Sequence, residues 1–369
     1  MKKIIHKSFF KNYIIEGEVP STKIPSVNEF QLGKNFFYEV VNNKKLLSLH
    51  KQLNDVLLNK IDLNNAAVAF RKDYSYLHLF EPHRTNYYFL RLDIRSFFHS
   101  IRVDDIKEIF KAYISEDEYI DDKKKQSILE GFINLVTYTI PADSKNDKFK
   151  EKQVLPMGFT TSPVISNIIF RKLDIQIQKF CSKNNIIYTR YADDMLFSSS
   201  LASSFVHSES FIKEIRITIS QMKFQLNENK TIRTKHTISL NGYTIQYSYF
   251  ENFLKLHKQE YKINEVRLSN KKTNIIKEMI YLIEVKKMSS QKILWKLFHY
   301  KLRFKFVITE SDVRKKYYDD QLLNKVSGYR SYLLSIIKFN KKYSCTRDTT
   351  IKKYSELINN LDKIIDYKY

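Results

Sequence analysis

The chain has 369 residues, with 63 Lys and Arg against 40 Asp and Glu, so its formal net charge is +23 at pH 7. Hydrophobic residues make up 43% of the chain and Gly and Pro number only 6 each, a composition that excludes an intrinsically disordered protein. This length supports two or three subdomains around a sizeable core, and the excess of positive charge indicates a polyanionic partner.

In chain order, the predicted elements begin with a helical extension over residues 1–60, where Leu46, Leu49 and Leu53 recur at helical spacing. The following segments are expected to alternate: strand-like over 66–100, helical over 101–135, an exposed loop over 141–153, a helix from Ser162-Pro163, a hairpin around 186–199, a helix around 208–224, a strand pair around 236–257 and basic helices after 260.

These elements suggest three regions: the extension 1–60, a mixed α+β region 61–250 and a helical region 251–369. The last region holds 27 Lys and Arg against 13 Asp and Glu, so about +14 of the net charge lies there. We expect this region to contact phosphates.

Cys181 and Cys345 are the only cysteines, which excludes a disulfide framework and a cysteine zinc site. The basic start of the chain lacks an uninterrupted apolar run, and no stretch has the length of a membrane span. We therefore expect a soluble protein of the reducing cytoplasm, without a membrane partner.

Two adjacent carboxylates, Asp193 and Asp194, lie in "RYADDML" (190–196) between two β-prone segments. This pattern predicts a hairpin with an acidic turn. A solvated acidic turn without a further role is the simplest interpretation of the pair taken alone.

Asp93 ends an apolar segment, Tyr87–Leu92. A carboxylate at the end of a buried strand is costly unless it is paired or binds a cation, so an N-cap or an arginine partner is the structural alternative. If its strand neighbours the acidic hairpin, Asp93 and Asp193 converge, and their hard oxygens suit two Mg²⁺ ions that promote phosphoryl transfer.

Six segments in the expected order resemble the motifs of reverse transcriptases: "AFRK" (69–72), "LDIRSFFHSI" (92–101), "LPMGFTTSPVISNIIF" (155–170), "YADD" (191–194), "FQLNENKT" (224–231) and "SLNGYTI" (239–245). The resemblance covers about residues 61 to 250 and implies an α+β right-hand fold: fingers and a palm with an antiparallel sheet and the YADD hairpin, followed by a helical thumb. The implied activity is RNA-directed DNA polymerisation with dNTP substrates and two Mg²⁺ ions.

Within this family, the chain looks most like bacterial retron-type and defence-associated reverse transcriptases, and the wording "LPMGFTTSPVISN" favours type 3 of the latter. Two retron signatures are incomplete, because "LFEPH" (79–83) keeps only His83 and "LNGY" replaces the usual V-T-G box.

The resemblance implies roles for the residues that match these motifs. Asp93 and Asp193 would ligate both metal ions, Asp194 would support the site as a further ligand, and the carbonyl of Ile94 would complete the metal shell. Lys230 would lie near the pyrophosphate as a general acid, although an ordinary surface lysine explains it equally well.

The nucleotide contacts follow from the same resemblance. Arg71 and Lys72 would hold the triphosphate, and Phe98 would be the steric gate that excludes a ribose 2′-hydroxyl, with core packing as its alternative. Gly158 would leave space at the floor of the site. Met157 departs from the usual Gln, and a thioether cannot donate a hydrogen bond to the nucleotide.

The implied partners are a structured non-coding RNA template and the nascent DNA, in a bacterial anti-phage system. A companion defence protein, a second reverse transcriptase and an oligomer are further expectations of the same kind. Two other functions stay open at this point: template-independent or protein-primed DNA synthesis by the same site, and a non-catalytic RNA-binding scaffold.

Overall fold

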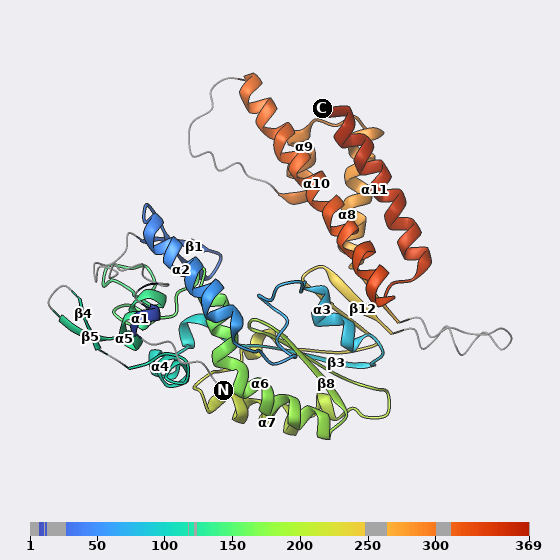
Figure 1. The fold of residues 1–369 in the computed structure, drawn as a ribbon. Helices are drawn as coiled ribbons and strands as arrows, with labels where there is room; N and C mark the ends of the chain where they lie inside the picture. Colours follow the sequence, from blue (N-terminus) through green and yellow to red (C-terminus); the bar gives the residue numbers. More distant parts are fainter. Residues whose placement is uncertain are drawn as a thin grey trace. The chain divides into compact units, whose positions relative to one another are not determined.

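The computed structural model describes residues 7–10, 12, 27–116, 118–121, 124–247, 264–299 and 311–368. They form two compact units (Figure 1). The first comprises Met1–Leu79 and Tyr88–Arg233, and the second comprises Phe80–Tyr87 and Thr234–Tyr369. The predicted α+β class is confirmed, with an antiparallel sheet in the first unit and long helices in the second.

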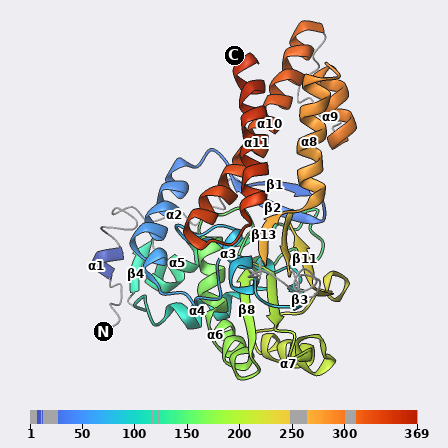
Figure 2. The ribbon, with the colours of Figure 1, turned by 90° about the vertical axis from the view of Figure 1, so that its right-hand side faces the viewer.

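The sheet of the first unit brings together strands that are distant in sequence. β3 (Tyr88–Asp93) pairs with β9 (Asp194–Ser199), which pairs in turn with β8 (Ile186–Tyr191), and both pairings are antiparallel. Every residue of β9 is buried, so both faces of this strand are covered. Helices α6 (Ser162–Lys183) and α7 (Glu209–Ser220) lie along one face of this sheet (Figures 1 and 2).

The predicted helix from Ser162 is confirmed as α6. Pro163 lies in its first turn, where a missing N–H costs nothing. Ile165, Leu173 and Ile177 follow at helical spacing and are fully buried. This helix anchors the main hydrophobic core of the first unit.

The prediction that residues 1–60 are helical was wrong over 27–40. A hairpin of β1 (Val27–Leu32) and β2 (Asn35–Val40) precedes helix α2 (Lys44–Val56). Gly33 adopts a φ of 62° in the two-residue turn, a conformation that glycine adopts without strain. The aromatic and β-branched residues on either side of this glycine were the signal for a hairpin.

Two further expectations need correction. Within 66–100 the only strand is β3, and the residues before it form turns and short helices. Within 101–135, the hairpin β4 (Glu118–Asp121) and β5 (Lys124–Ser127) separates α4 (Val103–Phe110) from α5 (Ile128–Val136).

The remaining elements are short: α1 (Lys7–Phe9), η2 (Leu58–Lys60), α3 (Leu77–Phe80), η3 (Glu81–His83), η4 (Phe98–Ser100), β6 (Tyr138–Thr139), β7 (Gln153–Val154), η5 (Phe205–His207), η6 (Glu228–Lys230) and β10 (Ile232–Lys235). The predicted loop over 141–153 contains no helix or strand before β7.

The second unit contains a three-stranded sheet and a group of helices. Strands β11 (Thr237–Leu240), β12 (Tyr243–Gln246) and β13 (Glu265–Leu268) are antiparallel neighbours. β13 was not predicted. The predicted boundary between residues 250 and 251 lies outside the described residues.

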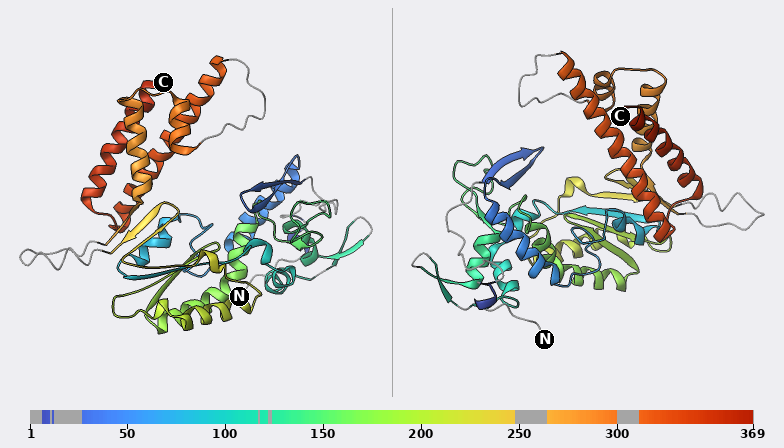
Figure 3. Two further views of the ribbon diagram at one scale, coloured as in Figure 1. Left: turned by 180° about the vertical axis from the view of Figure 1, so that it is seen from behind. Right: turned by 45° about the horizontal axis from the view of Figure 1, so that its top comes forward.

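Among the described residues, four helices follow the three-stranded sheet: α8 (Asn270–Glu284), α9 (Ser290–Phe298), α10 (Ser311–Tyr343) and α11 (Asp348–Lys368). α10 lies beside both α9 and α11 (Figure 3). Their buried faces include Ile276, Leu333 and Leu361, each at most 1% exposed. The helical end that the sequence predicted is therefore present in the described part of the chain.

Candidate active site

Two acidic residues meet where neighbouring strands of the first unit end. Asp93 is the last residue of β3 and lies directly opposite Asp194, the first residue of β9. The amide of Ile94 donates a hydrogen bond of 3.0 Å to the carbonyl of Asp193. The carboxylates that the sequence predicted to converge therefore lie at one end of one sheet.

The hairpin turn places Asp193 beside this pair. Tyr191 and Asp194 are the last paired residues of β8 and β9, so only Ala192 and Asp193 form the turn. Ala192 has a φ of 54°, a left-handed conformation that a non-glycine residue adopts only at a cost. The tight reversal fixes two consecutive carboxylates at the strand ends.

Burial and the proximity of the carboxylates to one another raise the pKa of Asp193 and that of Asp194. Burial, followed by the charges of Asp194 and Asp93, raises the pKa of Asp193 to about 6. Burial also raises the pKa of Asp194, although the guanidinium of Arg91 opposes this shift. A cation close to Asp193 would stabilise its ionised form.

Two basic side chains, Arg91 and Lys230, already contact the acidic group. Arg91 precedes Asp93 by two residues and so shares its face of β3. Its Nε donates to Asp194 Oδ1 at 2.7 Å, and its Nη2 bonds both Asp194 Oδ1 and, at 3.3 Å, Asp93 Oδ2. Lys230 Nζ donates to Asp93 Oδ2 at 2.9 Å, and Asn227 Nδ2 donates to Asp93 Oδ1 at 3.0 Å.

Arg91 and Asn227 were not singled out from the sequence. The position of Arg91, two residues before a strand-terminal carboxylate, was the available signal, since alternate residues of a strand share a face. Asn227 lies in the "FQLNENKT" segment, three residues before Lys230. Its contact with Asp93 joins residues far apart in sequence, for which spacing gives no signal.

Metal ligation can be assessed from the same contacts. Across the described ranges, no group of three or more His, Cys, Asp or Glu side chains is spaced to hold a metal ion as the side chains stand. The donor chemistry nevertheless suits Mg²⁺, which prefers carboxylate oxygens, and the three carboxylates are close enough to raise the pKa of one of them. In the structure, the side chains of Arg91 and Lys230 supply the positive charge beside the carboxylates of Asp194 and Asp93.

Phe98 and Phe97 occupy different environments beside Asp93. Phe97 is 3% exposed and contacts Phe170 and Phe224, with ring centroids 5.7 Å from each. Phe98 is 8% exposed, and its ring faces Phe70 at 6.2 Å. Both rings belong to the hydrophobic core, and they contact each other with centroids 5.4 Å apart, so the role of Phe98 as a steric gate stays a prediction.

Gly158 is required by a close backbone approach. It has a φ of 122°, and a Cβ atom there would lie 2.5 Å from the carbonyl oxygen of Tyr38. The amide of Tyr38 also donates to the carbonyl of Met157 at 2.7 Å. Packing against β2 accounts for this glycine without reference to a nucleotide, and Met157 is half-buried beside it.

Arg71 and Lys72 lie in the turn that precedes α3. The guanidinium of Arg71 donates to the carbonyls of Asn64 and Ala67 at 3.3 and 3.2 Å and lies over the ring of Tyr74 at 4.4 Å. These contacts hold Arg71 against its own segment. Lys72 is exposed.

A buried ion pair lies directly behind the acidic hairpin. Arg190 and Asp174 are both fully buried, and two hydrogen bonds of 2.9 and 2.7 Å join them. Nη1 of Arg190 also donates to the carbonyl of Ala192, in the turn, at 2.9 Å. This pair was not predicted, although an arginine inside an apolar strand was a signal that it needs a partner.

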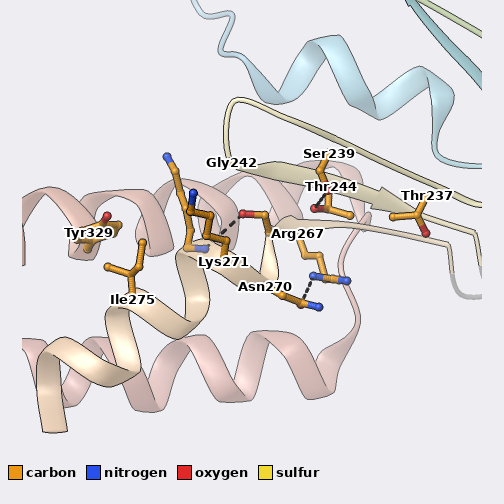
Figure 4. Close-up of a pocket in the computed structure, with 11 residues that line it drawn as sticks. Thr237, Ser239, Gly242, Thr244, Arg267, Asn270, Lys271, Ile275 and Tyr329 are labelled. Carbon is orange, nitrogen blue, oxygen red and sulfur yellow. Dashed lines mark hydrogen bonds between the residues drawn. The ribbon is translucent and has the colours of Figure 1, made fainter. Parts of the chain in front are cut away.

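The second unit has a cavity of about 550 Å³ at the start of α8 (Figure 4). Hydroxyl groups of β11 and β12 face it together with three cationic residues, Arg267, Lys271 and Lys272. Arg267 Nη1 donates to Asn270 Oδ1 at 2.8 Å, which fixes the guanidinium beside the first turn of the helix. The residues that line this cavity therefore include three cations and several hydroxyl groups, beside the apolar side chains of Ile275 and Tyr329.

Comparison with known proteins agrees with this geometry. The family model of the reverse transcriptase (RNA-dependent DNA polymerase) matches residues 40–245. The retron Ec83 reverse transcriptase of Escherichia coli is 26% identical over 246 residues, which cover 64% of this chain and 74% of that protein.

Two further similarities are weaker, one in the share of the chains that it covers and the other in sequence identity. The retron Ec73 reverse transcriptase of Escherichia coli is 31% identical over 174 residues, which cover 46% of this chain and 50% of that protein. The telomerase of Candida albicans, solved with a fragment of telomeric RNA, is 12% identical with a TM-score of 0.44, over 94% of this chain and 64% of that one. A score this low shows a distant likeness and nothing further.

No described helix combines the length and the apolar character that crossing a lipid bilayer requires.

The matches to retron enzymes confirm the predicted retron-type resemblance, whereas the defence-associated subgroup and type 3 stay predictions. Because the family model covers more than half of the sequence, the chain belongs to the reverse transcriptases, the family of RNA-dependent DNA polymerases.

Proposed function

We propose that this protein extends a primer with dNTPs on an RNA template, with Asp93, Asp193 and Asp194 holding two Mg²⁺ ions. The observation that carries this proposal is the cross-strand pairing of Asp93 with Asp194, with Asp193 in the adjoining turn. When bound, Mg²⁺ supplies the positive charge that stabilises the phosphoryl-transfer transition state. The carbonyl of Ile94 is the further proposed ligand.

The side chains around this group would bind and orient the nucleotide. Arg71 and Lys72 would contact the triphosphate, which requires Arg71 to exchange its backbone partners for phosphate oxygens. Lys230, whose side chain is 51% exposed, would donate a proton to the leaving pyrophosphate. Met157 and Gly158 would form the floor under the sugar.

Phe98 would exclude ribonucleotides. Its neighbour Phe97 fills the core, so the packing of the unit does not depend on Phe98 alone. A flat ring close to Asp93 leaves no room for a 2′-hydroxyl group, so we expect dNTPs to be preferred.

The second unit would contact the backbone of the template–primer duplex. Arg267, Lys271 and Lys272 line its cavity together with hydroxyl groups of β11 and β12. Arg267 and Lys271 are labelled in Figure 4. A surface of hydroxyl and cationic groups recognises phosphates independently of sequence. We therefore expect affinity for nucleic acid to fall as the salt concentration rises.

The biological partner would be a dedicated structured non-coding RNA, and the setting would be anti-phage defence in the bacterial cytoplasm. Similarity to retron reverse transcriptases supports an RNA template, and the remainder of this part rests on the resemblance of the sequence motifs. Sequencing of the nucleic acid that co-purifies with the protein tests it. One enriched RNA species is expected, and an unselected mixture of cellular RNA would contradict it.

Primer extension by the wild-type protein tests the activity itself. DNA synthesis that requires Mg²⁺, dNTPs and an annealed RNA template supports RNA-directed polymerisation. Synthesis that continues without any template would instead show template-independent or protein-primed activity. The absence of synthesis with any template, in a protein that still binds RNA, would show a non-catalytic scaffold.

A further inference from the structure

We propose that the ring of Phe70 is the surface against which the base of the incoming nucleotide stacks. This inference rests on the proposed function, because it assigns a second contact to the nucleotide that Asp93 and Asp193 would act on. It names a residue that determines nucleotide affinity rather than the chemical step.

The backbone at Phe70 is strained. Its φ is 57°, in the left-handed region that glycine and asparagine adopt far more readily than an aromatic residue does. Strain of this kind persists where surrounding contacts fix the chain, and it clusters at functional sites. A glycine here would fold without strain, so the presence of phenylalanine favours a use for its side chain.

The contacts on either side of Phe70 explain how the strained conformation is held. The amide of Val68 donates to the carbonyl of Arg190 at 2.9 Å, and Asn167 Nδ2 donates to the carbonyl of Ala69 at 2.8 Å. Strand β8 and helix α6 therefore fix the chain up to the residue before Phe70. Its position is set by the same elements that position the acidic hairpin.

The ring itself borders the candidate active site. Its centroid lies 6.2 Å from that of Phe98 and 6.1 Å from that of Tyr191. Phe98 follows Asp93 by five residues, and Tyr191 precedes Asp193 by two. The ring of Phe70 thus touches aromatic neighbours from both segments that carry the carboxylates.

Part of this ring is open to solvent. Phe70 is 40% exposed, whereas Phe97 and Phe98 are 3% and 8% exposed. Core packing therefore does not account for the whole ring. A nucleobase offers a flat apolar face to an exposed aromatic ring, and stacking of this kind tolerates any base. Phe70 directly precedes Arg71, the residue proposed to contact the triphosphate, so the two proposed nucleotide contacts are adjacent in the sequence.

Four variants distinguish the effect of losing the Phe70 ring from the effect of relieving the backbone strain at this residue. Phe70→Ala removes the ring and keeps the strain, Phe70→Gly removes both, Phe70→Asn keeps a residue suited to the left-handed region, and Phe70→Trp keeps an aromatic surface. All should extend primers if the site is intact. We expect Ala, Gly and Asn to raise the KM for dNTPs roughly tenfold with kcat changed less than twofold, and Trp to retain the wild-type KM.

Fluorescence can measure the binding of a nucleotide near position 70 without any catalytic turnover. Trp295 is the only tryptophan, so Phe70→Trp combined with Trp295→Phe creates a single reporter beside the site. We expect dATP with Mg²⁺ to quench its fluorescence saturably. The matched control is Tyr281→Trp combined with Trp295→Phe, because Tyr281 is 45% exposed and lies in the second unit; dATP should leave its fluorescence unchanged.

These results distinguish the proposed role of Phe70 from the proposed polymerase function of the protein. Saturable quenching in a protein that never extends a primer would contradict the proposed function and support the role of Phe70. Extension with an unchanged KM in the Ala, Gly and Asn variants, together with no quenching, would overturn the role of Phe70 and leave the proposed function standing.

Discussion

Nη1 of Arg190 donates a hydrogen bond of 2.9 Å to the carbonyl of Ala192, so a fully buried guanidinium supports the turn that carries Asp193. The same guanidinium forms a two-point ion pair with Asp174 of α6. It also lies over the ring of Phe170 at 4.4 Å. The acidic turn is thereby tied to the longest helix of the first unit.

Arg190→Met should destabilise the protein by about 3–5 kcal/mol, because it leaves the buried carboxylate of Asp174 without its cationic partner, with only the Tyr188 hydroxyl still donating to it. Urea unfolding followed by circular dichroism measures this change. Arg190→Met combined with Asp174→Leu should recover part of the loss, since no unpaired charge then stays buried. The control is Arg102→Gln, whose ion pair with Asp105 is at the surface and should be worth less than about 1 kcal/mol. A loss below about 1 kcal/mol in Arg190→Met would contradict the role of the pair.

Asp193→Asn should stabilise the protein at neutral pH when no divalent cation is present. Burial and two neighbouring carboxylates raise the pKa of Asp193 to about 6 from its usual 3.8. The folded state therefore binds the proton more tightly, and the ionised form costs stability progressively as pH rises from about 4 through 6.

The asparagine variant lacks this cost, so its advantage should be about 1–2 kcal/mol at pH 7.5 and should vanish near pH 4. Urea unfolding in EDTA at both pH values tests this expectation. Asp147→Asn is the control, because the Asp147 side chain is 87% exposed and far less crowded. An advantage of Asp193→Asn that is equal at both pH values would refute the assigned cause.

Phe98→Val should allow ribonucleotides into the site. Removing the ring opens space for a 2′-hydroxyl, and a steric exclusion of this size is commonly worth about 10–200-fold in selectivity. The ratio of kcat/KM for a dNTP to that for the matching rNTP measures it. Phe97→Val is the matched control: it should lower stability, since Phe97 packs in the core, without changing this ratio. An unchanged ratio in Phe98→Val would leave core packing as the whole role of Phe98.

Met157→Gln should alter nucleotide preference. The thioether accepts hydrogen bonds only weakly and donates none, whereas a glutamine amide does both. Single-nucleotide incorporation with each of the four dNTPs gives the comparison. An identical incorporation profile in the variant and the wild type would show that position 157 does not contact the nucleotide.

Much of the palm could be predicted because its signals are local. The hairpin around Asp193 follows from two β-prone segments joined by a two-residue turn, and α6 follows from its Ser-Pro start and apolar stripe. The convergence of Asp93 with the hairpin was a spatial hypothesis, and the register of β3 against β9 agrees with it. The catalytic roles of these residues stay predictions.

The features that were missed depend on contacts between distant residues or on turn chemistry. Arg190 and Asp174 belong to different elements, and no periodicity in either one reveals the other. The hairpin β1–β2 was missed because the helical prediction for 1–60 rested on the leucine spacing after residue 45, which carries no information about the residues around Gly33. Residues 66–87 have a strand-like composition, but local backbone bonds such as those from Tyr74 to Arg71 and from His78 to Ser75 form turns there.

RNA-templated primer extension by Asp93→Asn and Asp193→Asn, each beside the wild type and Asp147→Asn, is the sharpest comparison. Both site variants keep the size of the side chain and remove a negative charge that Mg²⁺ would need. We expect at least a 100-fold loss of kcat/KM in each, with Asp147→Asn close to wild type. Wild-type extension by either site variant, with the same requirement for Mg²⁺, would contradict polymerisation at the junction of β3 and β9.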